Sequence, residues 1–399
     1  MPTLKVCLLT DCYPPSIGGI EAHVYALASQ LGRLGHRVDV VTHQSVPPAA
    51  SQQIAPVDPP EPSTNVVVHR LQGVIVRIQD ADPVLDPRII SKVQNLLRVN
   101  DYDIVHGHSF GSVLALAGLR TARQLGLPTL ITKHSMVLAP IRPLFVHRVL
   151  LEGALWVAKK WADGVIAVSA AAAQELAALD LPTYVIPGGV DCEHWLPDPV
   201  ARKRIRSSLG YREDHIVVGY LARLTRSKGA MSLLTVADRI HRLLPEVRLL
   251  LIGDGPMRSQ LERQIENLGL EGVVTMLGFK PWWETPDYLN AMDIFALPSF
   301  REAFGLALVE ALACGIAAVA RTNEGAKEII ADGETGYLIA SDEEFFQKLL
   351  RLAEDEDLRK RIGVNARRSV LEKYSWKVIA ERTVEAYRDA IQRRMERCA

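Results

Sequence analysis

The sequence lacks a net charge, although charged residues are common in it. Its 46 Lys and Arg residues balance 46 Asp and Glu residues, and 15 basic and 14 acidic residues fall in the first 190 positions, so both halves are balanced. A nucleic-acid-binding protein needs a basic stripe, and a polybasic membrane anchor needs a basic cluster. Neither class is predicted. The apolar content of 48% is ample for large cores, which excludes global disorder.

Cysteine is also scarce, and long apolar runs are missing. The five cysteines are scattered, odd in number and never form C-x-x-C, so neither a disulfide framework nor a structural zinc site is expected. The first apolar run, residues 6–9, is too short for a secretory signal. No stretch approaches the ~20 apolar residues needed to span a bilayer. We therefore expect a cytoplasmic protein that is at most associated with a membrane surface.

Short apolar runs alternate with amphipathic stretches along the chain, as in βαβ units. A strand at Lys5–Thr10, a Pro/Gly loop, a helix at Glu21–Leu34 and a strand at Val38–Thr42 open the chain. Further strands are predicted at residues 66–77, 104–108, 129–133, 164–169 and 185–187.

The same pattern restarts after an irregular segment at residues 188–213. It predicts strands at 216–221, 248–252, 273–277, 294–297 and 316–320, with helices at 230–244, 257–268 and 305–314. The 399 residues thus predict an α/β protein made of two doubly wound domains that face each other across a cleft. Ligands of such folds bind outside the carboxyl ends of the strands.

The strongest constellation lies around Glu302 and Glu310, eight residues apart. Glu302 follows a predicted strand, and Glu310 lies on an otherwise apolar helix, where a carboxylate needs a hydrogen-bonding partner. The helix N-terminus near Phe304 and Gly305 presents free N–H groups, which suit a phosphate. The alternative is a helix cap plus a solvated surface charge.

A second constellation follows the first strand of the second half. Arg223 and Lys228 stand at its carboxyl end, where two cations can neutralise a diphosphate. The alternative for this segment alone is a solvated basic turn.

Two histidines and two acidic pairs are candidate metal ligands. His106 and His108 alternate along one predicted strand and share a face, so they form a satisfied pair, chelate a metal or contact ligand hydroxyls. Asp101 and Asp103 precede that strand and therefore lie at its amino end, and the acidic pair at residues 80–82 lies in a loop. No metal site is predicted. A dinucleotide oxidoreductase is disfavoured because no G-x-G-x-x-G follows the first strand.

These segments resemble the GT-B-fold, family 4 retaining glycosyltransferases over nearly the whole chain. Residues 298–310 look like the E-x7-E motif with its P-S-x-x-E-x-F-G lead-in, and residues 222–229 look like the G-R-L-x-x-x-K-G segment, with Ala222 in place of glycine. Residues 252–256 resemble the G-x-G-P loop of the family, and residues 13–21 resemble its Y-P-P-x-x-G-G-x-E loop.

Within the family, the resemblance is closest to the phosphatidylinositol N-acetylglucosaminyltransferase catalytic subunits and their bacterial relatives. That branch has a G-G-x-E-x-H opening, matched at residues 18–23, an H-x-H strand, matched by His106 and His108, and a T-x-H-S segment, matched at residues 132–135. The resemblance implies transfer of a sugar, N-acetylglucosamine from UDP-GlcNAc, to a hydroxyl of a small-molecule or lipid acceptor. Transfer would proceed with retention and without a metal, and no cofactor is expected because the nucleotide-sugar is a substrate.

The resemblance also implies domain boundaries and residue roles. Residues 1–190 with 376–399 would form the acceptor-binding domain, because in this family the last helix crosses back onto the first domain, and residues 191–375 would bind the nucleotide-sugar. The implied catalytic residues are His134, Glu302, Arg223 and Lys228; the donor-binding residues are Gly18, Gly19, Arg223, Lys228, Gly253, Gly255, Glu302, Phe304, Gly305 and Glu310; and the acceptor-binding residues are Glu21, His108 and His134.

Alternatives stay open at this point. One is a glycogen- or sucrose-type synthase that uses a simple sugar, and another is a non-catalytic nucleotide-sugar-binding partner. Glu324 stands where the family usually has glycine, and this extra carboxylate either alters sugar choice or is exposed. Arg142–Trp161 mixes apolar and basic residues, so it forms either a surface helix or a peripheral membrane contact. The acceptor and the oligomeric state do not follow from the sequence.

Overall fold

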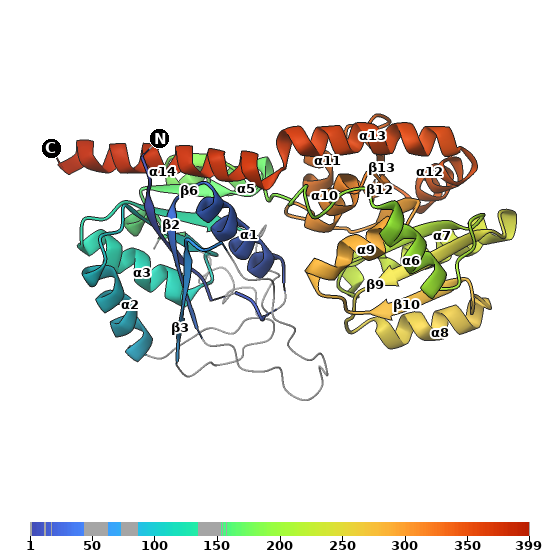
Figure 1. The fold of residues 1–399 in the computed structure, drawn as a ribbon, viewed down its shortest axis with the longest axis horizontal. Helices are drawn as coiled ribbons and strands as arrows, with labels where there is room; N and C mark the ends of the chain where they lie inside the picture. Colours follow the sequence, from blue (N-terminus) through green and yellow to red (C-terminus); the bar gives the residue numbers. More distant parts are fainter. Residues whose placement is uncertain are drawn as a thin grey trace. The chain divides into compact units, whose positions relative to one another are not determined.

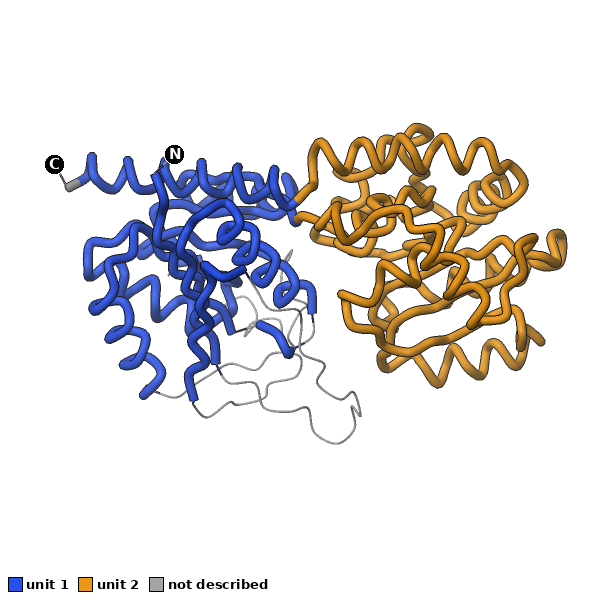
Figure 2. The backbone as a smooth tube through the Cα atoms, in the orientation of Figure 1, with its two compact units in different colours: residues 1–188, 376–399 blue, residues 189–375 orange. Residues whose placement is uncertain are grey.

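The computed structural model describes residues 2–11, 13–16, 18–43, 63–72, 87–134, 153, 155–156 and 158–398. The chain divides into two compact units (Figure 2). Unit 1 comprises residues 1–188 and 376–399, and unit 2 comprises residues 189–375. The sequence placed the first boundary two residues later, within the Pro-Gly-Gly-Val-Asp loop that leaves unit 1.

Unit 1 is built on a parallel sheet of seven strands (Figure 1). The strands are β1 (Lys5–Leu9), β2 (Arg37–His43), β3 (Val66–Leu71), β4 (Ile104–His108), β5 (Thr129–Lys133), β6 (Gly164–Ala167) and β7 (Thr183–Val185). Their order is β3-β2-β1-β4-β5-β6-β7, so the order reverses between β1 and β4. Strands β4, β5 and β6 are buried along their whole length, as expected for a sheet covered on both faces.

Helices cover this sheet. They are α1 (Gly19–Arg33), α2 (Pro87–Val99), α3 (Val113–Gln124), α5 (Ala170–Gln174) and α14 (Trp376–Cys398), with a 3₁₀ turn at Ala177–Leu179. Helix α1 packs against α14, and α2 packs against α3. The apolar face of α1 repeats at Val24, Leu27, Ala28 and Leu31, all of them buried, which is the spacing that predicted this helix.

Unit 2 is built on a parallel sheet of six strands. They are β8 (Ile216–Leu221), β9 (Val247–Ile252), β10 (Val274–Gly278), β11 (Ile294–Leu297), β12 (Ala317–Arg321) and β13 (Tyr337–Ile339), in the order β10-β9-β8-β11-β12-β13. The order reverses between β8 and β11. The predicted α/β class with two Rossmann-like domains is confirmed, because both units are parallel sheets with βαβ crossovers.

The helices of unit 2 are α6 (Pro199–Ser208), α7 (Ala230–Leu243), α8 (Arg258–Leu268), α9 (Thr285–Asn290), α10 (Leu306–Ala313), α11 (Glu324–Ile329), α12 (Asp342–Glu354) and α13 (Glu356–Lys373), with 3₁₀ turns at Arg226–Lys228 and Trp282–Glu284. The main core gathers residues of β8, β9, β11 and β12 with α7 and α12. Strand β13 and helices α11 to α13 extend the fold beyond the elements that the sequence predicted.

The described part of the chain bears on two expectations, membrane association and the state of the cysteines. No helix there is both long and apolar enough to cross a membrane. Cys7, Cys192 and Cys314 are free thiols. The basic and apolar segment at 142–161 lies largely outside the described residues, so its proposed lipid contact stays a prediction.

Candidate functional site

The loops after β8 and β11 contact each other at the carboxyl edge of the unit 2 sheet, where the strand order reverses. The loop after β8 ends in the 3₁₀ turn at Arg226–Lys228, and the backbone N–H of Phe300, in the loop after β11, donates to the Ser227 carbonyl at 2.8 Å. Gly229 adopts a φ of +73°, and a Cβ there would lie 2.3 Å from the Pro298 carbonyl oxygen. Only glycine fits this contact. The loop of Arg223 and Lys228 and the loop of Glu302, which the sequence marked separately, are therefore in direct contact.

This contact brings Lys228 and Glu302 together. The Lys228 Nζ atom lies 2.6 Å from Glu302 Oε1, and the side chains are 28% and 12% exposed. Arg223 lies in the same loop and is exposed. The pair is therefore partly shielded from water, and Arg223 adds a second cation to the same loop.

The loop after β9 packs on the loop after β8 through two glycines. A Cβ at Gly253 would lie 1.9 Å from the Ala222 carbonyl oxygen, and one at Gly255 would lie 2.6 Å from that of Leu224. Both glycines have positive φ angles, 135° and 155°. Their presence is thus explained by close backbone approach, independently of any ligand.

Helix α10 carries the remaining predicted residues of unit 2. It begins after Gly305, whose φ of +110° requires glycine, and the N–H groups of Leu308 and Val309 donate to the Gly305 carbonyl. The N–H groups before them are left without intrahelical acceptors, as at every helix start. The Phe304 ring is buried and lies 5.5 Å from the Tyr374 ring, so this side chain packs in the interior.

Glu310 is the fifth residue of α10, between apolar neighbours, and is half-buried. Burial raises the pKa of its carboxyl to about 7. No hydrogen bond or ion pair of this carboxylate is found within the part of the chain that the structure describes. A polar ligand that donates hydroxyls would satisfy it.

The raised pKa of Glu310 predicts a pH-dependent stability. Between pH 4.5 and about 7 the folded chain retains a proton that the unfolded chain releases, so stability falls as pH rises through this window and is level above it. The whole change is at most about 3 kcal/mol. Urea unfolding at pH 5, 6, 7 and 8 measures it. Glu310→Gln should remove the slope and be the more stable protein at pH 8; an unchanged slope would assign it to another group.

Unit 1 presents its predicted residues at the carboxyl ends of β1, β4 and β5, which are neighbours in the sheet. Gly18 and Gly19 are exposed at the start of α1. The Glu21 carboxylate lies beside Gly18, since a Cβ at Gly18 would lie 2.3 Å from Glu21 Oε2. Burial raises the pKa of Glu21. The glycine backbone is therefore open to a ligand and has a carboxyl beside it.

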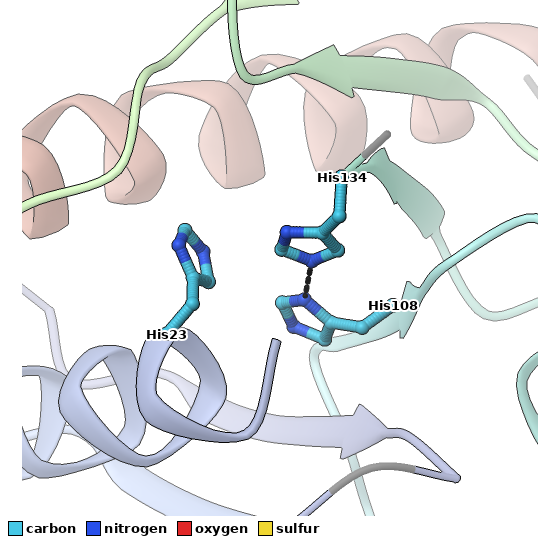
Figure 3. A group of neighbouring side chains, drawn as sticks. All are labelled: His23, His108 and His134. Atoms are coloured by element: carbon cyan, nitrogen blue, oxygen red, sulfur yellow. Dashed lines mark hydrogen bonds between the residues drawn. The ribbon is translucent and has the colours of Figure 1, made fainter. Parts of the chain in front are cut away.

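Three histidines meet at this edge of the sheet (Figure 3). His23 rises from α1 toward His108, the last residue of β4, and His134, which follows β5. His108 Nδ1 and His134 Nε2 are hydrogen-bonded at 3.0 Å, and the His23 and His134 ring centroids are 4.6 Å apart. Burial lowers the pKa of His23 to about 4 and those of the other two well below the usual histidine value. All three are neutral imidazoles at pH 7.

His106 supports this cluster from inside the sheet. Its ring lies 4.2 Å from the His108 ring, its Nδ1 is 2.8 Å from the Tyr387 hydroxyl and its Nε2 is 2.7 Å from Thr132 Oγ1. His106 is thus a satisfied core histidine, one of the alternatives that the sequence left open. Tyr387 belongs to α14, the C-terminal helix of unit 1, and sequence reasoning missed it because nothing local marks a residue 281 positions away.

Tyr387→Phe tests this support. The substitution keeps the ring but leaves the buried His106 Nδ1 without its partner, so it should cost about 1–3 kcal/mol of unfolding free energy. Tyr184→Phe is the matched control, since its hydroxyl bonds Asp389 on the same helix, whose partly exposed carboxylate keeps Arg393 and water as partners, so this substitution should cost less than Tyr387→Phe. Urea unfolding compares them. Equal costs would contradict a special role for the buried contact.

In the acidic pair before β4, Asp101 and Asp103, the second residue makes a hydrogen bond to the backbone. Asp103 Oδ2 accepts from the Lys5 backbone N–H at 2.7 Å at the amino end of the strand, away from the histidines. The pair at residues 80–82 lies outside the described residues. In the described part of the chain, only His23, His108 and His134 offer three ligand atoms within 4.8 Å of one another.

Comparison with known proteins identifies the family. A family model described as "Glycosyltransferase Family 4" matches residues 17–194, and one described as "Glycosyl transferases group 1" matches residues 201–369. The alpha-maltose-1-phosphate synthase of Mycolicibacterium smegmatis is 30% identical over 96% of this chain and 99% of that protein. The gpi3 subunit of the Schizosaccharomyces pombe phosphatidylinositol N-acetylglucosaminyltransferase is 27% identical over 95% of this chain and 79% of that protein.

Solved structures agree on the fold. The HepE protein of Anabaena, in complex with UDP-glucose, superposes with a TM-score of 0.77 at 23% identity, over 97% of this chain and 100% of that one. The matches span both halves of the chain. The chain belongs to the family 4 glycosyltransferases of the GT-B fold.

Proposed function

We propose that this enzyme transfers N-acetylglucosamine from UDP-GlcNAc, with retention of configuration, to a hydroxyl of a small-molecule or lipid acceptor, and that it needs no catalytic metal. The Lys228–Glu302 pair at the reversal point of the unit 2 sheet carries this proposal. A fixed cation and carboxylate at that edge are what a phosphorylated sugar requires.

The pair suggests how the donor binds. Without a donor, Lys228 and Glu302 neutralise each other at 2.6 Å. When the donor binds, its diphosphate would form ion pairs with Lys228 and Arg223, and its sugar hydroxyls would donate hydrogen bonds to Glu302. The start of α10 adds N–H groups to the phosphate, and Glu310 accepts from the ribose hydroxyls, which supplies the partner that it lacks.

Lys228, Arg223 and the N–H groups of α10 would stabilise the leaving diphosphate in place of a metal ion. Negative charge grows on the diphosphate as the bond to the sugar breaks, and preorganised cations and N–H groups stabilise this charge more in the transition state than in the ground state. Gly18 and Gly19 would let the donor phosphate approach the backbone. In unit 1, the neutral imidazoles of His108 and His134 would bond sugar or acceptor hydroxyls, together with Glu21.

A second candidate is a synthase that joins simple sugars. It is favoured by the 30% identity to a protein whose name is alpha-maltose-1-phosphate synthase, and by HepE, whose structure holds UDP-glucose. The N-acetylglucosamine donor is favoured by the similarity to phosphatidylinositol N-acetylglucosaminyltransferase subunits from a plant and from yeasts. A non-catalytic binding partner is disfavoured because the full leaving-group set is present.

Donor choice is testable before the acceptor is known. Thermal shift with UDP-GlcNAc, UDP-glucose and other nucleotide-sugars ranks the donors, and UDP-GlcNAc should stabilise the chain most. Mass spectrometry of acceptor candidates with that donor then finds the product, and the anomeric coupling in its NMR spectrum should be that of the donor. Stronger stabilisation and turnover with UDP-glucose would favour the second candidate, and an inverted product would refute retention.

A further inference from the structure

The three-histidine cluster of unit 1 offers a type of chemistry that sugar transfer does not need. His23, His108 and His134 come from three different elements, yet one ring nitrogen of each lies within 4.8 Å of those of the other two (Figure 3). His23 and His108 are buried, and His134 is half-buried.

The spacing of the nitrogens suits a tetrahedral metal ion. Two nitrogen ligands of zinc at about 2.0–2.1 Å are about 3.3 Å apart. The His108 Nδ1 and His134 Nε2 atoms, at 3.0 Å, are already close to that spacing, and rotation of His23 about its side-chain bonds would bring in the third nitrogen. One of these two nitrogens carries the proton of their hydrogen bond, so that proton must move to the other nitrogen of its ring before both can bind the ion.

The surroundings of His108 also suit a metal ligand. His108 is wholly buried, and its Nε2 atom has no hydrogen-bonding partner in the described part of the chain, so Nε2 can hold the ring proton while Nδ1 binds the ion. Its Nδ1 is shared with His134, and the ring is held from behind by His106, which is itself fixed by Tyr387 and Thr132. A rigid imidazole that is supported from behind is what a metal site requires.

We propose that His23, His108 and His134 form a binding site for zinc or a similar transition-metal ion, with three imidazole ligands and one open position, and that occupancy inhibits sugar transfer. Imidazole nitrogens favour zinc, copper and nickel over magnesium, so magnesium should not bind. The site itself is independent of the proposed function. The inhibition rests on it, because the ion would occupy the His134 nitrogen that is proposed to bond a hydroxyl.

Metal binding is measured on the full chain after treatment with EDTA and desalting. Calorimetric titration with zinc should give one site per chain, and cobalt should give the intense visible bands of a tetrahedral complex. His23→Gln should weaken zinc binding at least about tenfold, by the usual effect of disturbing a metal shell. His194→Gln, an exposed histidine of unit 2, is the control and should bind like the wild type. Absence of saturable zinc binding, or equal affinity in both variants, would overturn the proposal.

A second variant of the cluster keeps the proposal testable if the first variant does not fold. His108→Gln should lose the same affinity as His23→Gln, and circular dichroism with thermal unfolding shows which of the two retains the native fold. Loss of zinc binding in a folded variant supports the site, whereas retention of zinc binding in a folded variant of either position refutes it.

Inhibition is measured separately, as release of UDP from the donor. Zinc should inhibit the wild type and leave His23→Gln active at the same concentration, while magnesium should change neither. Full activity of the zinc-bound wild type would refute inhibition. Because metal binding is measured without any sugar, a chain that binds zinc but releases no UDP would point to failure of the proposed function rather than of the site.

Discussion

Replacement of Lys228 by methionine is expected to lower kcat for sugar transfer by about 10²–10³-fold, the cost of removing one preorganised group that stabilises developing charge. Methionine keeps most of the length of lysine and removes the charge. Since charge on the diphosphate grows only as the bond breaks, KM should change less than kcat. Steady-state UDP release at several donor concentrations separates the two effects.

Lys327→Met is the matched control for this prediction. Lys327 is 51% exposed on α11, where it pairs with Glu324, so its loss should leave kcat within about twofold, as for other exposed pairs. If Lys228→Met raised KM alone, or if both variants lost activity equally, Lys228 would not be the group that stabilises the departing diphosphate.

Glu302→Gln is expected to lower kcat/KM by about 10²-fold or more, because the substitution weakens hydrogen bonds to the sugar and removes the partner of Lys228. Glu302 and Lys228 are in contact, so their effects should not add. The double variant should therefore be little worse than Lys228→Met alone. Kinetics of the two single variants and the double variant measure the coupling.

Glu324→Gln is the control for Glu302. It removes the carboxylate that departs from the family pattern, and this side chain is 51% exposed and paired with Lys327. Its kcat/KM should stay near that of the wild type. Full additivity of Glu302→Gln and Lys228→Met, or a loss with Glu324→Gln as large as that with Glu302→Gln, would contradict a role for the Lys228–Glu302 pair.

Most of the fold could be predicted from the sequence because both units use parallel sheets. Buried strands such as Ile104–His108 and Ile294–Leu297 lie between turn residues, and their predicted bounds match the structure. Strand β13, Tyr337–Ile339, is three residues long and has no long apolar run to reveal it. The C-terminal helix was assigned to the first domain by resemblance, because periodicity alone does not say which sheet a helix covers.

The candidate site could be predicted only in parts. Local patterns marked the loops of Lys228 and Glu302 separately, but their contact spans 74 positions and depends on how β8 and β11 pair. His23 was visible in the family motif, yet its approach to His134 follows from the packing of α1. Gly253 looked like a ligand residue, and the structure adds a reason of its own, the contact with the Ala222 carbonyl.

The central claim is that this chain cleaves a nucleotide-sugar with its own charged residues. The most direct measurement is UDP release from UDP-GlcNAc by the purified full-length chain in excess EDTA, with Lys228→Met in parallel. We expect slow UDP release by the wild type, undiminished by the chelator, and release at least about 10²-fold slower in the variant. Equal rates in the two proteins, or release only after a divalent metal is added back, would contradict the account.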